Sequence, residues 1–235
     1  MDVVYICRNG DNEELRYSIR SVIANMPHSK IWVVGGKPDW YTGNHIAVPQ
    51  ENDKYTNARN NMRAIASSQS PISPNFVLMN DDFFILKPIK EIKYYYGGLL
   101  VEKIAHLQKK YRRSSYINML IKSKRYLFSQ GIRYPKDYTL HVPFVMNKVK
   151  LRQIVDLENI SWRLAYGNLF NVGGIDVQLE SGDSKDVKIY WRNGKFQGAV
   201  KNSITDIYLS TEDRGFPQLI PMLEELFPNP SEFEK

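Results

Sequence analysis

Two adjacent carboxylates at the end of an apolar stretch are the most informative local feature of the sequence. Asp81 and Asp82 follow Asn80, directly after the apolar residues 76–79. Adjacent carboxylates in such a place repel each other and lose hydration, so they need a compensating cation or a network of hydrogen-bond donors. Their hard oxygen atoms favour Mg²⁺ or Mn²⁺, which bridges to the phosphates of a nucleotide in many proteins. Asp81 and Asp82 are therefore predicted metal ligands; the structural alternative is a turn in which an aspartate caps the backbone.

Three further side chains could take part in acid–base or anion chemistry, and each also has a purely structural interpretation. His141 stands in an apolar setting, where a histidine is commonly part of the core. Arg163 lies in an aromatic-rich helical stretch, where stacking or surface exposure would explain it. Asp213 could simply supply negative charge near the start of the last helix. The sequence contains no P-loop, zinc-site or serine-hydrolase motif, which excludes those classes.

The elements that would position these residues alternate between strands and helices. Apolar runs bounded by turn residues predict strands, and apolar residues at helical spacing predict helices. The expected strands are 3–7, 30–34, 45–48, 76–79 and 83–86; the expected helices are 12–25, capped by Asn12 with Leu15, Ile19, Val22 and Ile23 inward, and 56–68, with Met62, Ile65 and Ala66 inward. This order predicts an α/β fold with a mixed, mostly parallel sheet flanked by helices. Ligands of such sheets bind beyond the carboxyl ends of the strands, where residues 8–10 and 80–82 would meet.

The second half of the chain gives fewer local signals. Residues 90–130 look helical, residues 176–191 look like a hairpin or strand pair, and a helix is expected from Pro217 to Phe227. We see no internal repeat and no Gly/Ser-rich linker. The 235 residues therefore predict one domain, 1–235, large enough for a substantial core.

Positive charge is concentrated in one segment, residues 87–152. It holds 16 Lys or Arg and three acidic residues, a local balance of +13, whereas the whole chain carries +7, so the remainder sums to −6. Interleaved charges and rings suit binding to a polyanion, although a charged helix face is often only solvated. The segment is predicted to be a largely helical, acceptor-binding elaboration of the domain. Its predicted contacts are Lys109, Lys110, Arg112, Arg113, Lys122, Lys124 and Arg125.

Cysteine content and hydropathy indicate the compartment. The single cysteine, Cys7, cannot form an internal disulfide, which fits a reducing compartment. No signal peptide and no apolar stretch long enough to span a membrane is present. We therefore expect a cytoplasmic protein without a membrane span, in the host cytoplasm if a phage encodes it.

Several regions taken in order resemble the Stealth family, nucleotide-sugar-dependent sugar-1-phosphate transferases of capsule synthesis and lysosomal-enzyme tagging. The first region is similar to residues 2–10, with Cys7 where a tryptophan is usual. The closest match is Asn-Glu-Glu-Leu-Arg-Tyr-Ser-Ile-Arg-Ser at 12–21, and the same region continues through 31–34, 38–40 and 55–57 to residues 76–84. His141 and Pro143 resemble the His-x-Pro of the third region. Residues 208–213 and 223–234 resemble the fourth region.

The resemblance implies a GT-A-like, Rossmann-related core in which a short acidic motif holds a metal ion against the nucleoside diphosphate. By this resemblance His141, Arg163, Asp213 and Asp82 would be catalytic: His141 as base or phosphate contact, Arg163 as a clamp on developing negative charge, and Asp213 as an orienting group. The metal, Mg²⁺ or Mn²⁺, would lie on Asp81 and Asp82. The nucleotide sugar, with UDP as the favoured nucleotide, would lie against Arg8, Asn9, Gly10, Arg16, Arg20, Asn57, Arg59, Asn80 and Asp81.

The leading hypothesis is a metal-dependent glycosyltransferase, or sugar-1-phosphate transferase, that uses a nucleotide-sugar donor. The basic segment favours a polyanionic acceptor, such as DNA carrying hydroxymethyl pyrimidines or a phosphate-containing polymer. One alternative is a hexose-1-phosphate transferase of capsular or teichoic polymers. Another, of a different class, is a non-catalytic nucleic-acid-binding module on a degenerate transferase fold. The sequence leaves open the sugar, the nucleotide, the transferred group, the acceptor, the anomeric outcome and the oligomeric state.

Overall fold

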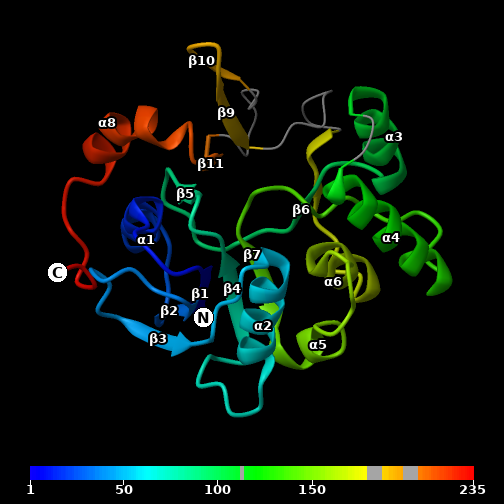
Figure 1. The fold of residues 1–235 in the computed structure, drawn as a ribbon, viewed down its shortest axis with the longest axis horizontal. Coiled ribbons are helices and arrows are strands. Elements are labelled where there is room, and N and C mark those ends of the chain that lie inside the picture. Colours follow the sequence, from blue (N-terminus) through cyan, green and yellow to red (C-terminus); the bar gives the residue numbers. More distant parts are fainter. Residues whose placement is uncertain (112–113, 179–186, 198–205) are drawn as a thin grey trace.

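The computed structural model describes residues 1–111, 114–178, 187–197 and 206–235. Its centre is a five-stranded sheet in the order β3-β2-β1-β4-β7 (Figure 1). The four strands β1 to β4 run parallel to their neighbours, and β7 runs antiparallel to β4. Their bounds are Asp2–Cys7 for β1, Ile31–Gly35 for β2, Asn44–Ala47 for β3, Asn75–Met79 for β4 and Phe144–Asn147 for β7.

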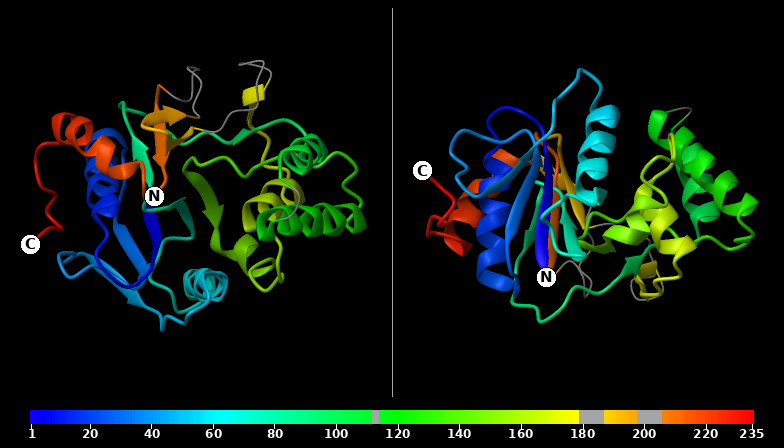
Figure 2. Two further views of the ribbon diagram at one scale, coloured as in Figure 1. Left: turned by 45° about the horizontal axis from the view of Figure 1, so that its top comes forward. Right: turned by 90° about the horizontal axis from the view of Figure 1, so that it is seen from below.

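Helices cover both faces of this sheet, so the alternating side chains of β1 enter two different cores. Val3 and Tyr5 pack on the side of α1 (Glu13–Asn25), whereas Val4 packs on the opposite side. The helices of that opposite side are α2 (Lys54–Ala66), α5 (Lys148–Arg152) and α6 (Trp162–Leu169). The right-hand view of Figure 2 shows α1 and α2 on the two sides of the sheet. The predicted class, a mixed and mostly parallel sheet flanked by helices, is confirmed.

Local sequence signals determine the start and the buried face of α1. Asn12 caps the helix by accepting a hydrogen bond from the backbone N–H of Leu15 at 2.9 Å, as its position predicts. Leu15, Ile19 and Val22 are fully buried on the sheet side. The inward placement predicted for Ile23 is wrong: its side chain is 39% exposed, because it lies one position beyond the buried stripe.

A second, four-stranded sheet in the order β10-β9-β11-β5 lies beside α1. Its strands are β5 (Phe83–Ile85), β9 (Lys188–Arg192), β10 (Lys195–Gln197) and β11 (Tyr208–Thr211). The helix α8 (Phe216–Leu226) packs on it through Phe216, which stacks on Phe84. The described ends of the hairpin or strand pair predicted over 176–191 do not pair with each other, and residues 179–186 lie outside the described residues. The strand β9 forms its hairpin with β10, and β8 (Ile175–Asp176) pairs instead with β6 (Tyr95–Tyr96).

The basic segment contains a small helical layer. The helices α3 (Leu100–Lys110) and α4 (Ser115–Ser129) pack against α6 around Leu100, Leu120 and Leu164. Residues 90–99, predicted helical, instead contain β6 and irregular backbone, with Gly98 in the left-handed region at φ 72°. The segment 87–152 also includes β7 and α5, which belong to the central sheet and its covering layer. Among the described residues no helix is long and apolar enough to cross a membrane.

Candidate active site

A polar cavity of about 800 Å³ opens at the carboxyl edge of the central sheet. It lies where β1 and β4 end, at the point where the strand order changes direction, since β1 connects through α1 to β2 on one side while β4 lies on the other. The loop after β1, the loop after β4 and the first turns of α2 enclose it. Its lining residues are Ile6, Cys7, Arg8, Asn9, Glu14, Gln50, Glu51, Asn52, Lys54, Asn57, Ala58, Asn61, Asn80, Asp81, Asp82 and Asp213.

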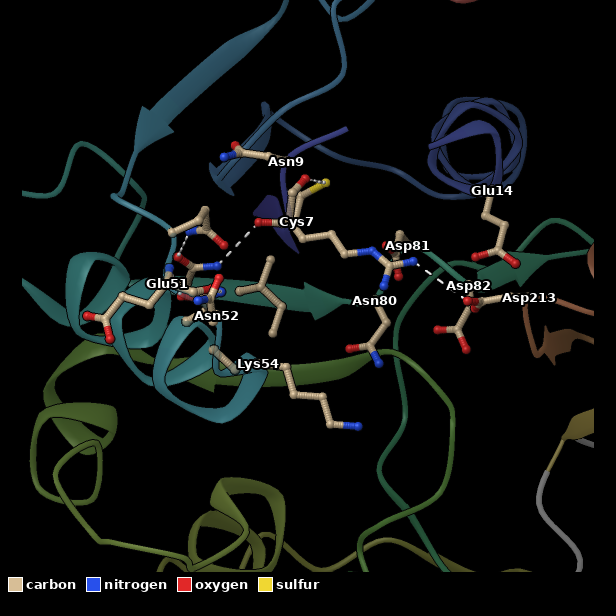
Figure 3. Close-up of a pocket in the computed structure, with 16 residues that line it drawn as sticks. Cys7, Asn9, Glu14, Glu51, Asn52, Lys54, Asn80, Asp81, Asp82 and Asp213 are labelled. Atoms are coloured by element: carbon tan, nitrogen blue, oxygen red, sulfur yellow. Dashed lines mark hydrogen bonds and ion pairs between the residues drawn. The ribbon is translucent and has the colours of Figure 1, made fainter. Parts of the chain in front are cut away.

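Carboxylates gather at one end of the cavity. Figure 3 shows Glu14, Asp81, Asp82 and Asp213 together there, Glu51 and Asn52 at the other end, and the side chain of Lys54 extending from that end towards Asn80. The four carboxylates come from three segments: the first turn of α1, the loop after β4 for the two adjacent aspartates, and the residues after β11. Residues distant in sequence thus form one acidic site.

Hydrogen bonds fix the two adjacent aspartates differently. Asp81 accepts a hydrogen bond from the Asn12 amide at 2.6 Å. Asp82 accepts one from the Lys188 ammonium at 2.9 Å and one from the Ser210 hydroxyl at 3.0 Å, all at a single oxygen, Oδ2. The ion pair of Asp82 is largely enclosed, because the two side chains are 13% and 16% exposed.

Strand register brings these partners to Asp82. In β11, Ser210 pairs with Phe83 of β5 on one side and with Lys188 of β9 on the other. Because Asp82 immediately precedes Phe83, the side chains of Ser210 and Lys188 both reach the carboxylate of Asp82. The second sheet therefore serves to hold the acidic motif of the first.

The acidic end holds more negative charge than its fixed cations neutralise. Burial, together with the charges of Asp81, Asp82 and Asp213, raises the pKa of Glu14 to about 8. Burial and the charge of Asp82 also raise the pKa of Asp81. Within the part of the chain that the structure describes, Glu14 Oε1 is buried and has no hydrogen-bond partner. A cation entering this end would relieve both the repulsion and the missing contact.

Amide side chains line the other end. Asn61 donates to the carbonyl of Cys7 at 3.4 Å and accepts from Gln50 at 3.3 Å, while Asn57 and the backbone of Glu51 exchange two hydrogen bonds. Gly35 lies against this cluster at φ 110°, and a Cβ atom there would overlap the Cys7 carbonyl and Asn61. This end therefore offers donors and acceptors on a rigid frame.

The thiol of Cys7 is a structural part of the cavity floor. Its side chain is 3% exposed; it donates to the carbonyl of Arg8 at 3.3 Å and accepts from Asn12 at 3.7 Å. Burial and the nearby charge of Asp81 raise its pKa to about 12. A buried thiol with a raised pKa is typical of a structural cysteine.

The donor set suits a cation shared with a ligand better than a free-standing metal centre. Among the described residues no group of three or more His, Cys, Asp or Glu side chains is placed to hold a metal ion. Asp81 and Asp82 offer two hard carboxylates, and Mg²⁺ commonly takes one or two carboxylates with substrate phosphates completing its shell. The residues present fit that arrangement.

The residues His141 and Arg163 meet at the same edge of the sheet, outside the cavity lining. Because β7 runs antiparallel and begins at Phe144 opposite Leu78, the residues before it emerge beside the end of β4. His141 lies edge-on to Phe83 at 6.1 Å between ring centroids, and the Arg163 guanidinium lies 5.4 Å from the centroid of the same ring. Arg163 also donates to the carbonyls of Leu140 and Val142, at 2.8 and 2.7 Å. Both thus flank the residue that follows Asp82.

The remaining residues predicted at the donor site are distributed unevenly. Arg8, Asn9, Asn57, Asn80 and Asp81 line the cavity, and Gly10 and Arg59 do not. Asp213, predicted as a catalytic residue, also lines the cavity. Arg8 and Asp213 form a 3.7 Å ion pair across the mouth, with side chains 76% and 82% exposed, so the pair contributes little stability. Arg59 instead pairs with Glu158.

The arginines of α1 also lie elsewhere. Arg16 and Arg20 both bind the carboxylate of Glu234, at 2.9 and 2.6 Å, and Arg16 stacks over Trp40. The structure does not bring either side chain into the cavity lining. Their described contacts tie α1 to the residues near position 235.

The predicted acceptor contacts lie on the small helical layer. Lys109 and Lys110 are in the last turn of α3, and Lys122, Lys124 and Arg125 are in α4; all but the half-buried Lys124 are exposed. Arg112 and Arg113, also predicted contacts, lie outside the described residues.

Sequence reasoning missed several members of the site. Glu14 is one of them: it lies four residues before Ser18, whose hydroxyl donates to the Phe83 carbonyl, and so shares a helix face with the site. Lys188 and Ser210 reach Asp82 only through the pairing of distant strands, for which the sequence carries no local signal. Three more lining residues lie on α2 or just before it: Gln50, Lys54 and Asn61. The sequence around them is polar, and nothing in it distinguishes residues that line a cavity from residues that face solvent.

Comparisons with known proteins add little to this geometry. No protein-family model matches the sequence, and no curated protein matches it. Among solved structures, the chain is similar to the apo form of the glycosyltransferase GlyE of Streptococcus pneumoniae TIGR4, with a TM-score of 0.26 and 10% identity, over 48% of this chain and 39% of that one. The chain thus matches well under two thirds of the length of GlyE. A match with so low a TM-score carries no argument about this chain, so the GT-A-like core and the Stealth resemblance both stay predictions.

Proposed function

We propose that this protein is a glycosyltransferase or sugar-1-phosphate transferase that takes its donor from a nucleotide sugar with the help of a divalent cation. One observation carries the proposal: a polar cavity at the strand-order switch point, with four carboxylates from three segments at one end and a fixed amide cluster at the other. Open α/β sheets bind nucleotides at this position. The division into an acidic end and an amide end matches a ligand with a diphosphate at one end and a base at the other.

The donor would lie along the length of the cavity. Asn57, Asn61 and Gln50 would meet the nucleoside, since amides can satisfy both donors and acceptors of a base or ribose. Lys54 and Arg8 would contribute positive charge towards the phosphates. The diphosphate would approach Asp81 and Asp82, where negative charge on both sides requires a cation between them. A UDP-sugar is the donor we favour.

Mg²⁺ or Mn²⁺, held by Asp81 and Asp82, would neutralise the negative charge of the leaving diphosphate. In sugar transfer, an acceptor hydroxyl oxygen bonds to the anomeric carbon, the bond from that carbon to the diphosphate breaks with its electron pair, and the hydroxyl proton passes to a base. In sugar-1-phosphate transfer the same oxygen bonds instead to the phosphorus that bears the sugar, and nucleoside monophosphate leaves.

The roles of this chain's own residues follow from their positions. Asp213 and Glu14 border the acidic end and would orient the acceptor hydroxyl or receive its proton. His141 and Arg163 lie beyond Phe83, where His141 would serve as base or phosphate contact and Arg163 as a clamp on negative charge. Lys188, already paired to Asp82, would hold that carboxylate in place when ligands exchange.

A ligand panel tests the proposal directly. Thermal unfolding of the protein is measured with UDP-, GDP- and CMP-sugars, each with and without Mn²⁺, and with Mn²⁺ alone. We expect one nucleotide class to raise the midpoint by several degrees and to do so more strongly with Mn²⁺, since ligand binding to the folded state stabilises it. Intact-mass measurement of candidate acceptors after incubation then identifies the transferred group. No stabilisation by any nucleotide sugar would overturn the proposal and favour a non-catalytic nucleic-acid-binding module.

A further inference from the structure

We infer that the faces of α3 and α4 next to the cavity mouth bind a single-stranded nucleic acid, which would be the acceptor of the transfer proposed above. The role as acceptor rests on that proposed function, whereas the binding itself does not. Three observations carry the inference: the first turn of α4 contacts a residue beside the cavity lining, the cations of α3 and α4 are not neutralised by neighbouring acids, and exposed rings stand among those cations.

The start of α4 touches the rim of the cavity. The hydroxyl of Tyr55, next to the cavity-lining Lys54, lies 3.5 Å from the hydroxyl of Ser115 in the first turn of α4. Tyr116 donates to Thr139 at 3.2 Å, two residues before His141. In the right-hand view of Figure 2, α2 and the α3–α4 layer stand side by side. A ligand that extends out of the cavity on this side would therefore meet α4.

The cations of this layer keep their charge available. Lys109, Lys110, Lys122, Lys124 and Arg125 form no ion pair with any acidic side chain among the described residues. Only three acidic residues occur between positions 87 and 152, and one of them, Asp137, is fully buried and paired with Lys103. Unneutralised cations on adjoining helices attract a polyanion and release its counterions.

Exposed aromatic rings lie among these cations. Tyr55 is 48% exposed, Tyr111 42% and Phe128 46%. A lysine ammonium stands over each ring: Lys54 at 5.2 Å from the centroid of Tyr55, Lys110 at 5.4 Å from Tyr111 and Lys124 at 5.7 Å from Phe128. Each pair offers a stacking surface beside a phosphate-binding charge.

The combination of exposed rings with neighbouring lysines favours one class of polyanion over the others. A ringless phosphate polymer would use the cations and leave the rings exposed to water, and a neutral glycan would use the rings and not the charge. Bases of an intact duplex are stacked on each other and cannot lie on a protein ring, whereas bases of a single strand can. Alternating rings and phosphates therefore fit single-stranded nucleic acid best.

Fluorescence anisotropy tests the inference without any donor. Labelled dT20 is titrated with the full chain from low to moderate salt, and a 20-base-pair duplex and inorganic polyphosphate of matched charge serve as competitors. We expect dT20 to bind more tightly than either competitor. The variant Lys122→Ala/Arg125→Ala should lower the slope of log affinity against log salt by about 1.4. The variant Tyr55→Ala/Tyr111→Ala should weaken binding about tenfold at constant salt.

The matched control is Lys30→Ala/Lys195→Ala, which removes two exposed lysines from β-sheet regions and should leave dT20 binding unchanged. Equal losses in the control and in the α4 variant, or polyphosphate competing as well as dT20, would overturn the inference. Stabilisation by a UDP-sugar with Mn²⁺ is measured on the same variants. Donor binding without dT20 binding overturns this inference alone, whereas dT20 binding without any donor binding overturns the proposed function and leaves the surface as a nucleic-acid binder.

Discussion

A single carboxylate oxygen, Oδ2 of Asp82, receives both the Lys188 ammonium and the Ser210 hydroxyl. Neither partner contacts the other oxygen of Asp82, Oδ1. Asp81 is oriented separately, by a hydrogen bond from Asn12. The motif is thus held in place from both sides before any ligand binds. Preorganised charge of this kind avoids a cost of rearrangement when the ligand arrives.

Asp82→Asn should therefore separate function from stability. The amide keeps the shape and can still accept from Ser210, but it loses the charge that would hold a cation. We expect transfer activity to fall roughly 100-fold or more and Mn²⁺-dependent stabilisation by the donor to disappear, while the variant stays folded. Activity assays and thermal unfolding check this. Asp39→Asn, at an exposed position, is the matched control; full activity of Asp82→Asn would remove the metal role.

Residues whose immediate neighbours in sequence mark them out could be predicted to lie at the cavity. Residues brought there by the pairing of distant strands could not. Asp81 and Asp82 could be predicted because adjacent carboxylates after an apolar strand need compensation. Arg16 and Arg20 were assigned to the donor through resemblance, but the structure places them against Glu234. Which face of α1 meets the cavity depends on where the last residues of the chain pack, and no local pattern encodes that.

The helix α1 is linked to the acidic motif through one side chain. The Oδ1 atom of Asn12 caps the helix at Leu15, while its Nδ2 donates to Asp81. Asparagine alone among good capping residues supplies both an acceptor and a donor of this reach. The start of the helix and the geometry of the site are consequently coupled.

Two substitutions at Asn12 should separate these roles. Asn12→Ser keeps a capping oxygen and loses the contact with Asp81, so we expect a loss of about 1 kcal/mol in the free energy of unfolding. Asn12→Asp also keeps the cap but sets a carboxylate against Asp81, so we expect a loss of about 2 kcal/mol or more near neutral pH. Urea unfolding measures both. Wild-type stability of Asn12→Ser would mean that the contact with Asp81 contributes nothing.

Elements with local signals were predictable, and pairings between distant strands were not. The predicted helices 12–25 and 56–68 correspond to α1 and α2 within two residues at each end, because caps and apolar spacing are encoded locally. The hairpin or strand pair predicted over 176–191 does not form between its described ends, because β8 pairs with the remote β6, and β9 pairs with β10 and β11. Period-two patterning identifies a strand but does not choose its neighbour.

At the scale of the whole molecule, the last residues of the chain act as a clamp. Glu234 binds both Arg16 and Arg20, Phe233 packs on the ring of Tyr41, and the backbone of Lys235 donates to the carbonyl of Trp40. The carboxylate is almost enclosed, with its side chain 3% exposed. Residues 233–235 therefore join α1, through Glu234, to the loop after β2, through Phe233 and Lys235.

This clamp predicts a loss of stability in acid. Burial alone would raise the pKa of Glu234, but hydrogen bonds from Arg20 and Arg16 outweigh it and lower the pKa from 4.5 to about 2. Its stabilisation is therefore complete above about pH 4.5 and is lost as the pH falls towards 2, because the unfolded state then binds a proton that the folded state does not. Unfolding free energies between pH 2 and 7 measure this.

Glu234→Gln should cost about 2 kcal/mol at neutral pH, since two arginines lose a partly enclosed partner. Below pH 4.5, the free energy of unfolding of this variant should also depend less on pH than that of the wild type. Glu232→Gln, whose side chain is exposed, is the control. An unchanged slope between pH 2 and 4.5 in Glu234→Gln would contradict the assignment to Glu234.

The buried thiol on the cavity floor gives the protein an intrinsic probe. Cys7 is the only cysteine in the chain, so alkylation can add one reagent mass at one known site. Because the side chain is 3% exposed and its pKa is about 12, the reaction requires the end of β1 to open first. A molecule that occupies the cavity should slow that opening. Intact-mass kinetics on the unlabelled wild-type protein would thus report occupancy of the cavity directly, whatever the occupant is.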